Sequence, residues 1–245
     1  MFPISDDNPR RYVTPYVNWT LIGASILVFF WQVSLGSPGG DRAVFSLGMI
    51  PARLFGYAEL APGLETVPAW GTILTSMFMH GGLLHLGGNM LYLWIFGDNI
   101  EDCLGHGRYL IFYLLCGTAA AFGQALLDPT SEIPMVGASG AISGVLGAYV
   151  LLHPRATIRV LIFIVVFVTI GHIPAILVIG FWFLGQLISA ASAPASEGGI
   201  AFWAHIGGFV AGLALVPFMK RRHVPLLEPA YNRPFKIEHR RGPWG

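Results

Sequence analysis

The sequence predicts an all-α polytopic membrane protein whose chain crosses the bilayer six times. Of its 245 residues, 54% are hydrophobic and only 11% are charged, whereas soluble domains contain about 25% charged residues. Apolar segments recur along the whole chain, and basic residues are distributed unequally between the connections that separate them. The formal net charge of +1 gives no indication of a nucleic-acid partner.

The first half of the chain supplies four of the predicted spans. Residues 1–16 are polar and form a short cytoplasmic lead. The first span follows, and the absence of a small-residue cleavage site identifies it as a retained helix, not a signal peptide. The long connection 36–81 is rich in Gly and Pro, and its short apolar pieces fit the membrane interface. The four spans are predicted at 17–35, 83–97, 109–127 and 136–152.

The second half contains two further spans and a shorter apolar run. The run 160–170 falls below the roughly 20 residues needed to cross a bilayer, so we interpret it as an interfacial or re-entrant piece. The fifth span is predicted at 173–193, with Pro174 in its first turn, where proline is tolerated. The sixth occupies 200–219, which completes a membrane domain over 17–219. The basic, proline-containing tail 220–245 is predicted to be unstructured.

Six spans put both termini on one side of the membrane. With the termini in the cytoplasm, every Lys and Arg except Arg42 and Arg53 lies on the cytoplasmic side, as the positive-inside rule requires. We therefore expect a multi-pass protein of the plasma (inner) membrane of a bacterium. Ser139 and His205 then lie near the outer ends of the fourth and sixth spans, at a similar depth.

Ser139 and His205 are the strongest candidates for catalytic residues. Polar side chains within membrane helices are costly, and those that persist there are usually functional. Serine becomes a nucleophile when a base accepts its proton, and histidine is the usual base. No acidic residue has the position that a triad requires, so we predict a Ser–His dyad. Cys103 and Cys116 are expected to be reduced, packed thiols without a metal site.

Small residues predict that the fourth and sixth spans pack closely. Such residues let helix backbones approach in a membrane, where no hydrophobic force drives helices together. An alternative interpretation is that these stretches are packing motifs and nothing more. The rows are Ser139, Ser143 and Gly147, then Gly140, Gly144 and Ala148, and on the sixth span Gly208 and Gly212.

The second span supplies candidates for an oxyanion hole. His85 and Asn89 are four residues apart and share one helical face, which should point toward the protein interior. The alternative is that they form an interhelical hydrogen-bonded pair with a structural role. His80 is expected to brace the outer loop, and the remaining histidines lie at or near segment ends and are assigned no chemistry.

These residues together resemble the rhomboid family of intramembrane serine proteases. The resemblance covers about residues 15–220 and implies a six-transmembrane-helix rhomboid-like bundle. The order of the motifs and the spans that carry them agree with that family. The matching motifs are His85-x-x-x-Asn89, Gly137-x-Ser139-Gly140 and Ala204-His205-x-x-Gly208-x-x-x-Gly212.

The resemblance implies a role for each matched residue. Ser139 would be the nucleophile and His205 the general base, while Asn89, His85 and the Ser139 N–H would form the oxyanion hole. Gly137 would keep the approach to the serine open. The implied activity is endopeptidase cleavage in or beside transmembrane helices of other membrane proteins, in contact with lipid and without a metal or cofactor. The fifth helix would be the side of substrate entry, with Trp182 and Phe183 as candidate gate residues. The alternative is that these two aromatic side chains simply face lipid.

The sequence also departs from the family pattern. Some members carry an aromatic residue four positions after the serine, beneath the histidine, and here that position is Ser143. A Trp-Arg pair that some relatives have in the first outer loop is absent from this sequence. One alternative is a catalytically silent relative that binds membrane helices for trafficking or quality control. Another is a small transporter or channel, but the two halves of the sequence show no repeat.

Overall fold

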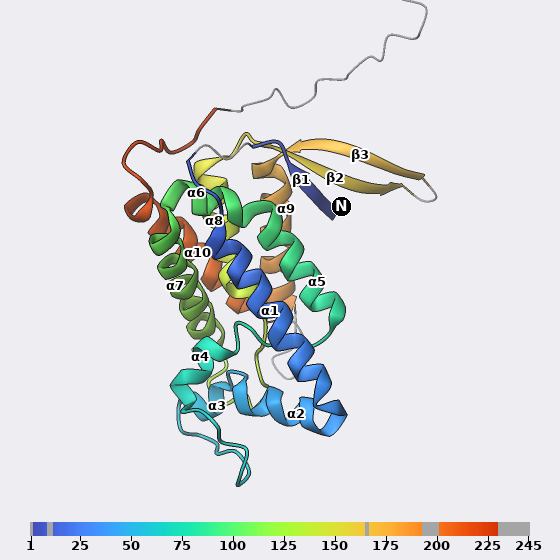
Figure 1. The fold of residues 1–245 in the computed structure, drawn as a ribbon, viewed down its shortest axis with the longest axis vertical. Helices are drawn as coiled ribbons and strands as arrows, with labels where there is room; N and C mark the ends of the chain where they lie inside the picture. The colour runs from blue at the N-terminus through green and yellow to red at the C-terminus, as the bar shows by residue number, and fades with distance from the viewer. Residues whose placement is uncertain (1, 9–11, 165–166, 193–200, 230–245) are drawn as a thin grey trace, which may run out of the picture.

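The protein is a helical bundle with a small β-sheet at one end and a helical connection at the other (Figure 1). The computed structural model describes residues 2–8, 12–164, 167–192 and 201–229. We refer to the two ends as the sheet end and the loop end.

Each predicted span contains a helix whose bounds lie within a few residues of the expected ones. The second is continuous but changes type, since a π-helical stretch, η2 (Leu93–Gly97), joins α5 to α6. The helices are α1 (Tyr16–Ser34), α5 (Leu83–Tyr92), α6 (Asp98–Leu104), α7 (His106–Ala125), α8 (Ser139–Leu152), α9 (Ala175–Ser192) and α10 (Phe202–Met219).

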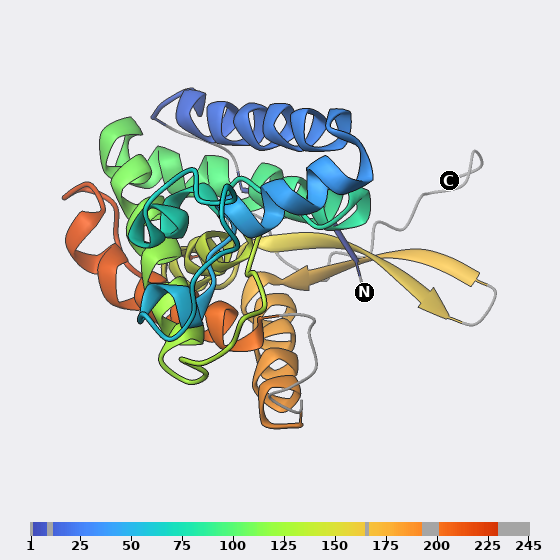
Figure 2. The ribbon, with the colours of Figure 1, turned by 90° about the horizontal axis from the view of Figure 1, so that it is seen from below.

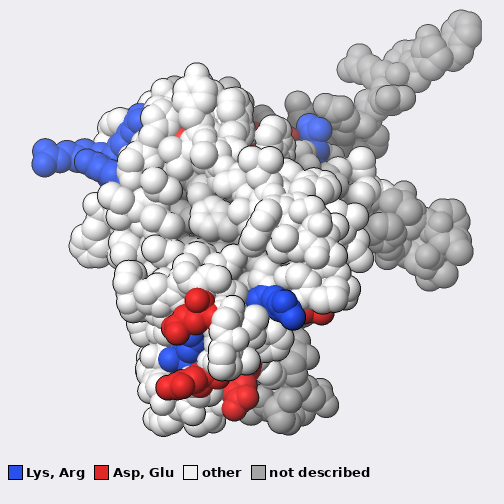
Figure 3. Space-filling model, turned by 60° about the horizontal axis from the view of Figure 1, so that its bottom comes forward, with Lys and Arg blue, Asp and Glu red and all other residues white. Residues whose placement is uncertain are grey.

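Three helices of the described chain are long and apolar enough to cross a membrane, namely α1, α9 and α10, and α8 is a shorter apolar helix. Figure 3 shows Lys, Arg, Asp and Glu gathered toward the two ends of one face, with a broad uncharged surface between them. This distribution suits a surface that faces lipid. The chain is a mostly helical, multi-pass integral membrane protein.

The loop end is a packed structure. It contains α2 (Gly36–Leu47), α3 (Pro51–Leu54), η1 (Ala69–Gly71) and α4 (Thr72–Thr75). Arg53 is only 8% exposed and donates to Glu65 Oε1 at 2.9 Å and to the Val67 carbonyl at 2.6 Å. The backbones of Met49 and Met135 pair as an isolated β-bridge. The connection therefore supports the segment that leads into α8.

The sheet end corrects three sequence predictions. The strands β1 (Phe2–Asp6), β2 (Thr157–Ile164) and β3 (Phe167–Pro174) form an antiparallel sheet in the order β1-β2-β3. The fold is therefore not all-α, the run 160–170, interpreted as an interfacial or re-entrant piece, forms most of a β-hairpin, and Pro174 ends a strand instead of lying in the first turn of a helix. The β-branched residues of this stretch favour strands. A hairpin and a short helix would both satisfy the backbone hydrogen-bonding groups of this segment.

The polar lead and the first part of the tail are also more ordered than predicted. β1 lies in the lead, and Asp102 Oδ1 accepts the N–H groups of Tyr12 and Val13. The Arg221 N–H donates to the Cys103 carbonyl at 2.9 Å. Glu228 is 7% exposed, and its Oε2 lies 3.1 Å from His153 Nδ1. Residues 230–245, also predicted to be unstructured, lie outside the described residues.

The tightest packing in the bundle joins α8 to α10. A Cβ built on Gly208 would collide with the Gly140 carbonyl oxygen, and one on Gly212 with the Gly144 carbonyl oxygen. The close approach predicted from the two glycine rows is therefore present. α9 lies beside α10 at the edge of the bundle, as the view from below shows (Figure 2).

Candidate active site

Ser139 is the first residue of α8 and follows a backbone turn that only glycine adopts readily. Gly137 has φ +125°, in the region that L side chains avoid. Its N–H donates to the Ser76 carbonyl at 2.9 Å. A Cβ at Gly137 would lie 2.8 Å from both Cε1 and Nε2 of His85. Glycine is therefore needed both for the turn and for the space between the turn and α5.

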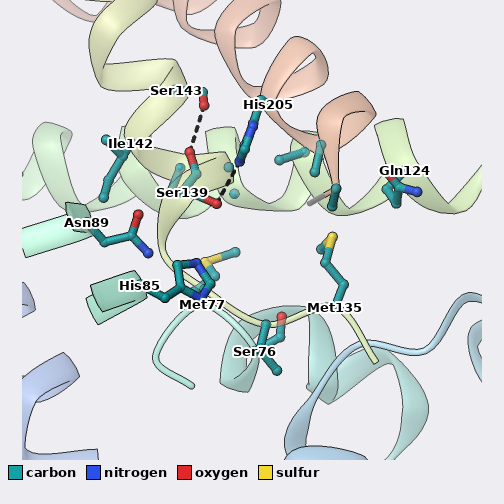
Figure 4. A pocket seen from close by; sticks show the side chains of 18 of the residues that line it. Ser76, Met77, His85, Asn89, Gln124, Met135, Ser139, Ile142, Ser143 and His205 are labelled. Carbon is teal, nitrogen blue, oxygen red and sulfur yellow. Dashed lines mark hydrogen bonds between the residues drawn. The ribbon is translucent and has the colours of Figure 1, made fainter. Parts of the chain in front are cut away.

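His205 lies in the first turn of α10 and points toward Ser139 (Figure 4). The Ser139 hydroxyl donates to His205 Nε2 at 2.9 Å. His205 is 9% exposed, so its ring is largely shielded by protein. The spacing is that of a nucleophile and its base. The hydrogen bond joins residues that are 66 positions apart in the sequence. The sequence analysis placed the two residues at a similar depth in their spans, which allows this contact.

The other nitrogen of the His205 ring has a partner that the sequence reasoning missed. His205 Nδ1–H donates to Gln186 Oε1, from α9, at 2.7 Å. One turn earlier on α9, the Trp182 ring lies 5.9 Å from the His205 ring, at an angle of 41°. A lone glutamine in an apolar helix was the available signal, because such a side chain needs a protein partner in a membrane. Phe183, the other candidate gate residue, stacks on Phe209 at 4.1 Å.

Ser143 does not take the place of the missing aromatic residue. Its hydroxyl donates to the Ser139 carbonyl at 2.7 Å, one turn back along α8. Ser143 thus bonds to the first turn of its own helix, whereas the aromatic ring nearest His205 comes from α9.

Hydrogen-bond donors lie across the site from His205. Asn89 is 8% exposed, and its side-chain nitrogen is buried without a hydrogen-bond partner among the described residues. Ser139 opens α8, so its N–H has no acceptor within the helix. Figure 4 shows the side chains of His85 and Asn89 directed toward the region of Ser139. Unpaired donors beside a nucleophile are what an oxyanion requires.

A cavity of about 670 Å³ contains these groups, which is within the range of about 300–1,000 Å³ typical of ligand sites. It is lined mainly from α5, α7, α8 and α10 and from the segment that precedes α8, with Trp182 contributed by α9. Gly208 and Gly212 do not line it, because they lie in the seam between α8 and α10. The predicted site residues on its wall are His85, Asn89, Gly137, Ser139, Gly140 and His205.

His80 lies beside the cavity, in the connection that precedes α5. It is fully buried, and its Nδ1 is 3.1 Å from the Phe78 carbonyl. Gln32 of α1 donates to the His80 carbonyl at 3.0 Å. The His80 ring meets the His85 ring edge to face at 5.3 Å. The contacts agree with the expectation that His80 braces the connection.

Comparison with known proteins supplies an independent observation. Residues 68–222 match the profile of the Rhomboid domain. The rhomboid protease GluP of Bacillus subtilis (strain 168) is 30% identical over 207 residues, which are 82% of this chain and 35% of the relative. The mitochondrial Rhomboid protein 1 of Saccharomyces cerevisiae is 32% identical over 183 residues, 71% of this chain and 49% of the relative.

The relatives differ in their described activity and in length. Inactive rhomboid protein 1 of Drosophila melanogaster is 34% identical over 89 residues, 36% of this chain and 6% of the relative. The chain spans about a third of the bacterial relative and half of the yeast one.

Proposed function

The chain belongs to the rhomboid family, and we propose that it is an intramembrane serine endopeptidase that uses Ser139 and His205 as a dyad. The observation that carries this proposal is the 2.9 Å hydrogen bond from the Ser139 hydroxyl to His205 Nε2. The bond lies on the wall of a cavity that also contains the side-chain nitrogen of Asn89, for which the described part of the chain offers no hydrogen-bond partner.

The proposed reaction is acyl transfer in two stages. His205 Nε2 accepts the hydroxyl proton as Ser139 Oγ attacks the scissile carbonyl carbon. The Ser139 N–H, the Asn89 amide and His85 donate to the oxyanion of the tetrahedral intermediate. When this collapses, His205 gives its proton to the departing amine. Water activated by His205 then hydrolyses the acyl-enzyme. No step requires a metal or cofactor.

We also propose that α1, the α5–α6 helix, α7, α8, α9 and α10 cross the bilayer, giving six spans over residues 17–219. Both termini would lie in the cytoplasm, in the inner membrane of a bacterium. The unequal distribution of Lys and Arg supports this orientation. The substrates would be transmembrane proteins that reach the cavity laterally, from the lipid. Trp182, which lines the cavity from the peripheral α9, would lie beside that route.

A catalytically silent membrane protein is the second candidate, since the matched relatives include an inactive rhomboid protein. Such a protein would bind transmembrane helices without cleaving them. The hydrogen-bonded pair of Ser139 and His205 favours the protease, because a binding protein has no need of a serine–histidine bond.

A serine-reactive fluorophosphonate probe tests the proposal directly. Purified protein in detergent should be labelled and should cleave a model transmembrane substrate. Ser139→Ala should abolish both activities while leaving thermal stability unchanged, since both side chains are small. Ser143→Ala is the matched control on the same helix and should retain labelling. Substantial cleavage by pure Ser139→Ala protein would rule out this nucleophile, and an unlabelled, inactive wild type would favour the silent relative.

A further inference from the structure

The two nitrogens of the His205 ring have partners on two different helices. Nε2 lies 2.9 Å from Ser139 Oγ on α8, and Nδ1 lies 2.7 Å from Gln186 Oε1 on α9. To accept the serine proton, Nε2 must present its lone pair, so the ring hydrogen must be on Nδ1. The partner of Nδ1 determines which tautomer a histidine adopts. An amide oxygen at that position only accepts hydrogen bonds, and it therefore favours the tautomer that the reaction needs.

The position of Gln186 corresponds chemically to the carboxylate of a triad. In triad enzymes this third group orients the imidazole and selects its tautomer. Asp128 is the acidic residue on the cavity wall, but the partner of His205 Nδ1 is Gln186. Trp182, four residues earlier and on the same helical face, packs against the ring. One face of α9 thus contacts both the edge and the side of the imidazole.

We propose that Gln186 is a positioning residue, which holds His205 in the orientation and tautomer that accept the Ser139 proton. The proposal rests on the proposed serine-protease function. It also assigns α9 a part in catalysis, because the dyad is correctly arranged only while Gln186 lies within hydrogen-bonding distance of His205.

The half of α9 that carries Gln186 is the less buried half of the helix. Its buried residues are Ala175 and Ile179, both in the half of the helix next to the sheet. The Ala175 N–H donates to the Ala156 carbonyl at 2.8 Å, which ties that end down. Gln186 lies in the other half, where burial is least. A displacement of that half would remove the acceptor from Nδ1 while leaving the α8–α10 seam intact, so α9 can switch the competence of the dyad.

The test compares two substitutions at Gln186. Gln186→Leu is close in volume but has no acceptor, and it should lower kcat and the fluorophosphonate labelling rate by about 10- to 100-fold, with little change in KM. Gln186→Glu keeps an oxygen in the same place and should restore most of the loss. Its carboxylate also stabilises the protonated imidazole, so the acidic limb of the pH–rate profile should move to higher pH.

Controls separate this proposal from the proposed function. Leu187→Ala changes the next residue, which is 39% exposed and is not among the residues that line the cavity, and it should label at the wild-type rate. If wild type labels and Ser139→Ala does not, the dyad stands whatever Gln186 does. The positioning role would then be overturned by a Gln186→Leu variant as active as wild type. Equal losses in the Leu and Glu variants, accompanied by a lower melting temperature, would also overturn it by showing a packing role.

Discussion

α10 and α9 both contact His205, but the rest of the protein holds these two helices very differently. α10 lies against α8 with no side chain between the backbones, since the carbonyl oxygens of Gly140 and Gly144 occupy the space that a Cβ on Gly208 or Gly212 would need. On α9, by contrast, a Cβ added to Gly180 or Gly185 would meet nothing within 4 Å. The α8–α10 contact is therefore backbone against backbone, whereas α9 meets α10 through side chains such as Phe183, which stacks on Phe209.

The difference separates two requirements of the site. The distance between Ser139, the proposed nucleophile, and His205, the proposed base, is set by the α8–α10 seam, where the two backbones are in direct contact. The orientation of the base is set by Gln186 and Trp182, which reach His205 from a helix with few buried residues. The proposed protease would have to admit another helix without losing its catalytic geometry, and this division would allow the α9 wall to move while the α8–α10 seam stays fixed.

Substitutions in the seam should have the largest effect. Gly212→Ala places a Cβ against the Gly144 carbonyl oxygen and should force α10 away from α8. Overpacking of this kind typically costs about 1–3 kcal/mol, and a displacement of about 1 Å at a catalytic site can cost about 100-fold in rate. We expect both a lower melting temperature in detergent and a loss of labelling by about 100-fold or more. Differential scanning fluorimetry and labelling kinetics measure the two effects.

Gly185→Ala on α9 is the matched control and should leave stability and labelling close to wild type. If the two glycine substitutions had equal effects, the contrast between the fixed and the movable helix would be wrong.

The next effect in size concerns Asn89, on the wall opposite both helices. If its amide donates to the oxyanion, Asn89→Ala should lower kcat by about 100-fold or more with little change in KM. Labelling by a fluorophosphonate should slow as well, because that reaction also develops charge on oxygen. If Asn89 only joins helices, the variant should lose on the order of 1 kcal/mol of stability and cleave normally. A variant that melts earlier but turns over at the wild-type rate would remove Asn89 from the site.

Trp182 should have a smaller effect than either. Aromatic pairs contribute about 0.5–1.5 kcal/mol beyond burial, so Trp182→Ala should slow labelling by about 2- to 10-fold through a less restrained His205 ring. Phe181→Ala is the control, since Phe181 is 67% exposed on the neighbouring position of α9. Equal losses in the two variants would mean that α9 acts through its bulk, and not through the contact with His205.

The same contrast explains what the sequence could and could not predict. Ser139, His205 and the glycine rows are recognisable because close helix packing requires small residues at fixed spacing, and each span has a strong apolar signal. Gln186 was missed because a hydrogen bond between two helices depends on their relative rotation, which no local pattern specifies. The sheet was missed for a related reason. A short β-branched, apolar run such as 160–170 suits a strand or an interfacial helix equally, and its pairing with residues near the N-terminus is a long-range contact.

The smallest expected effect concerns the fixed end of α9, which the sheet holds. β3 leads directly into α9, and β1 is joined to the bundle by Asp6, whose Oδ2 accepts from Asn99 Nδ2 at 2.8 Å and from the Tyr149 hydroxyl at 2.6 Å. The pKa of Asp6 is raised from 3.8 to about 7, chiefly by burial and also by the nearby Asp98 and Asp7, although the Tyr149 hydrogen bond acts to lower it.

The sign of the resulting pH dependence follows from proton binding. Between about pH 4 and 7 the folded protein keeps the Asp6 proton that the unfolded chain has lost, so this group's contribution to stability is full below pH 4 and is lost as the pH rises through 7. Asp6→Asn keeps an oxygen acceptor and does not titrate. It should therefore match wild type near pH 4 and melt about 2–4 °C higher at pH 8, the shift that about 1 kcal/mol produces in a chain of this size. Asp41→Asn, on the exposed surface of α2, should show no such divergence. If the melting curves of wild type and Asp6→Asn ran parallel from pH 4 to 8, Asp6 would carry the same charge in both states, and the sheet would hold α9 independently of pH.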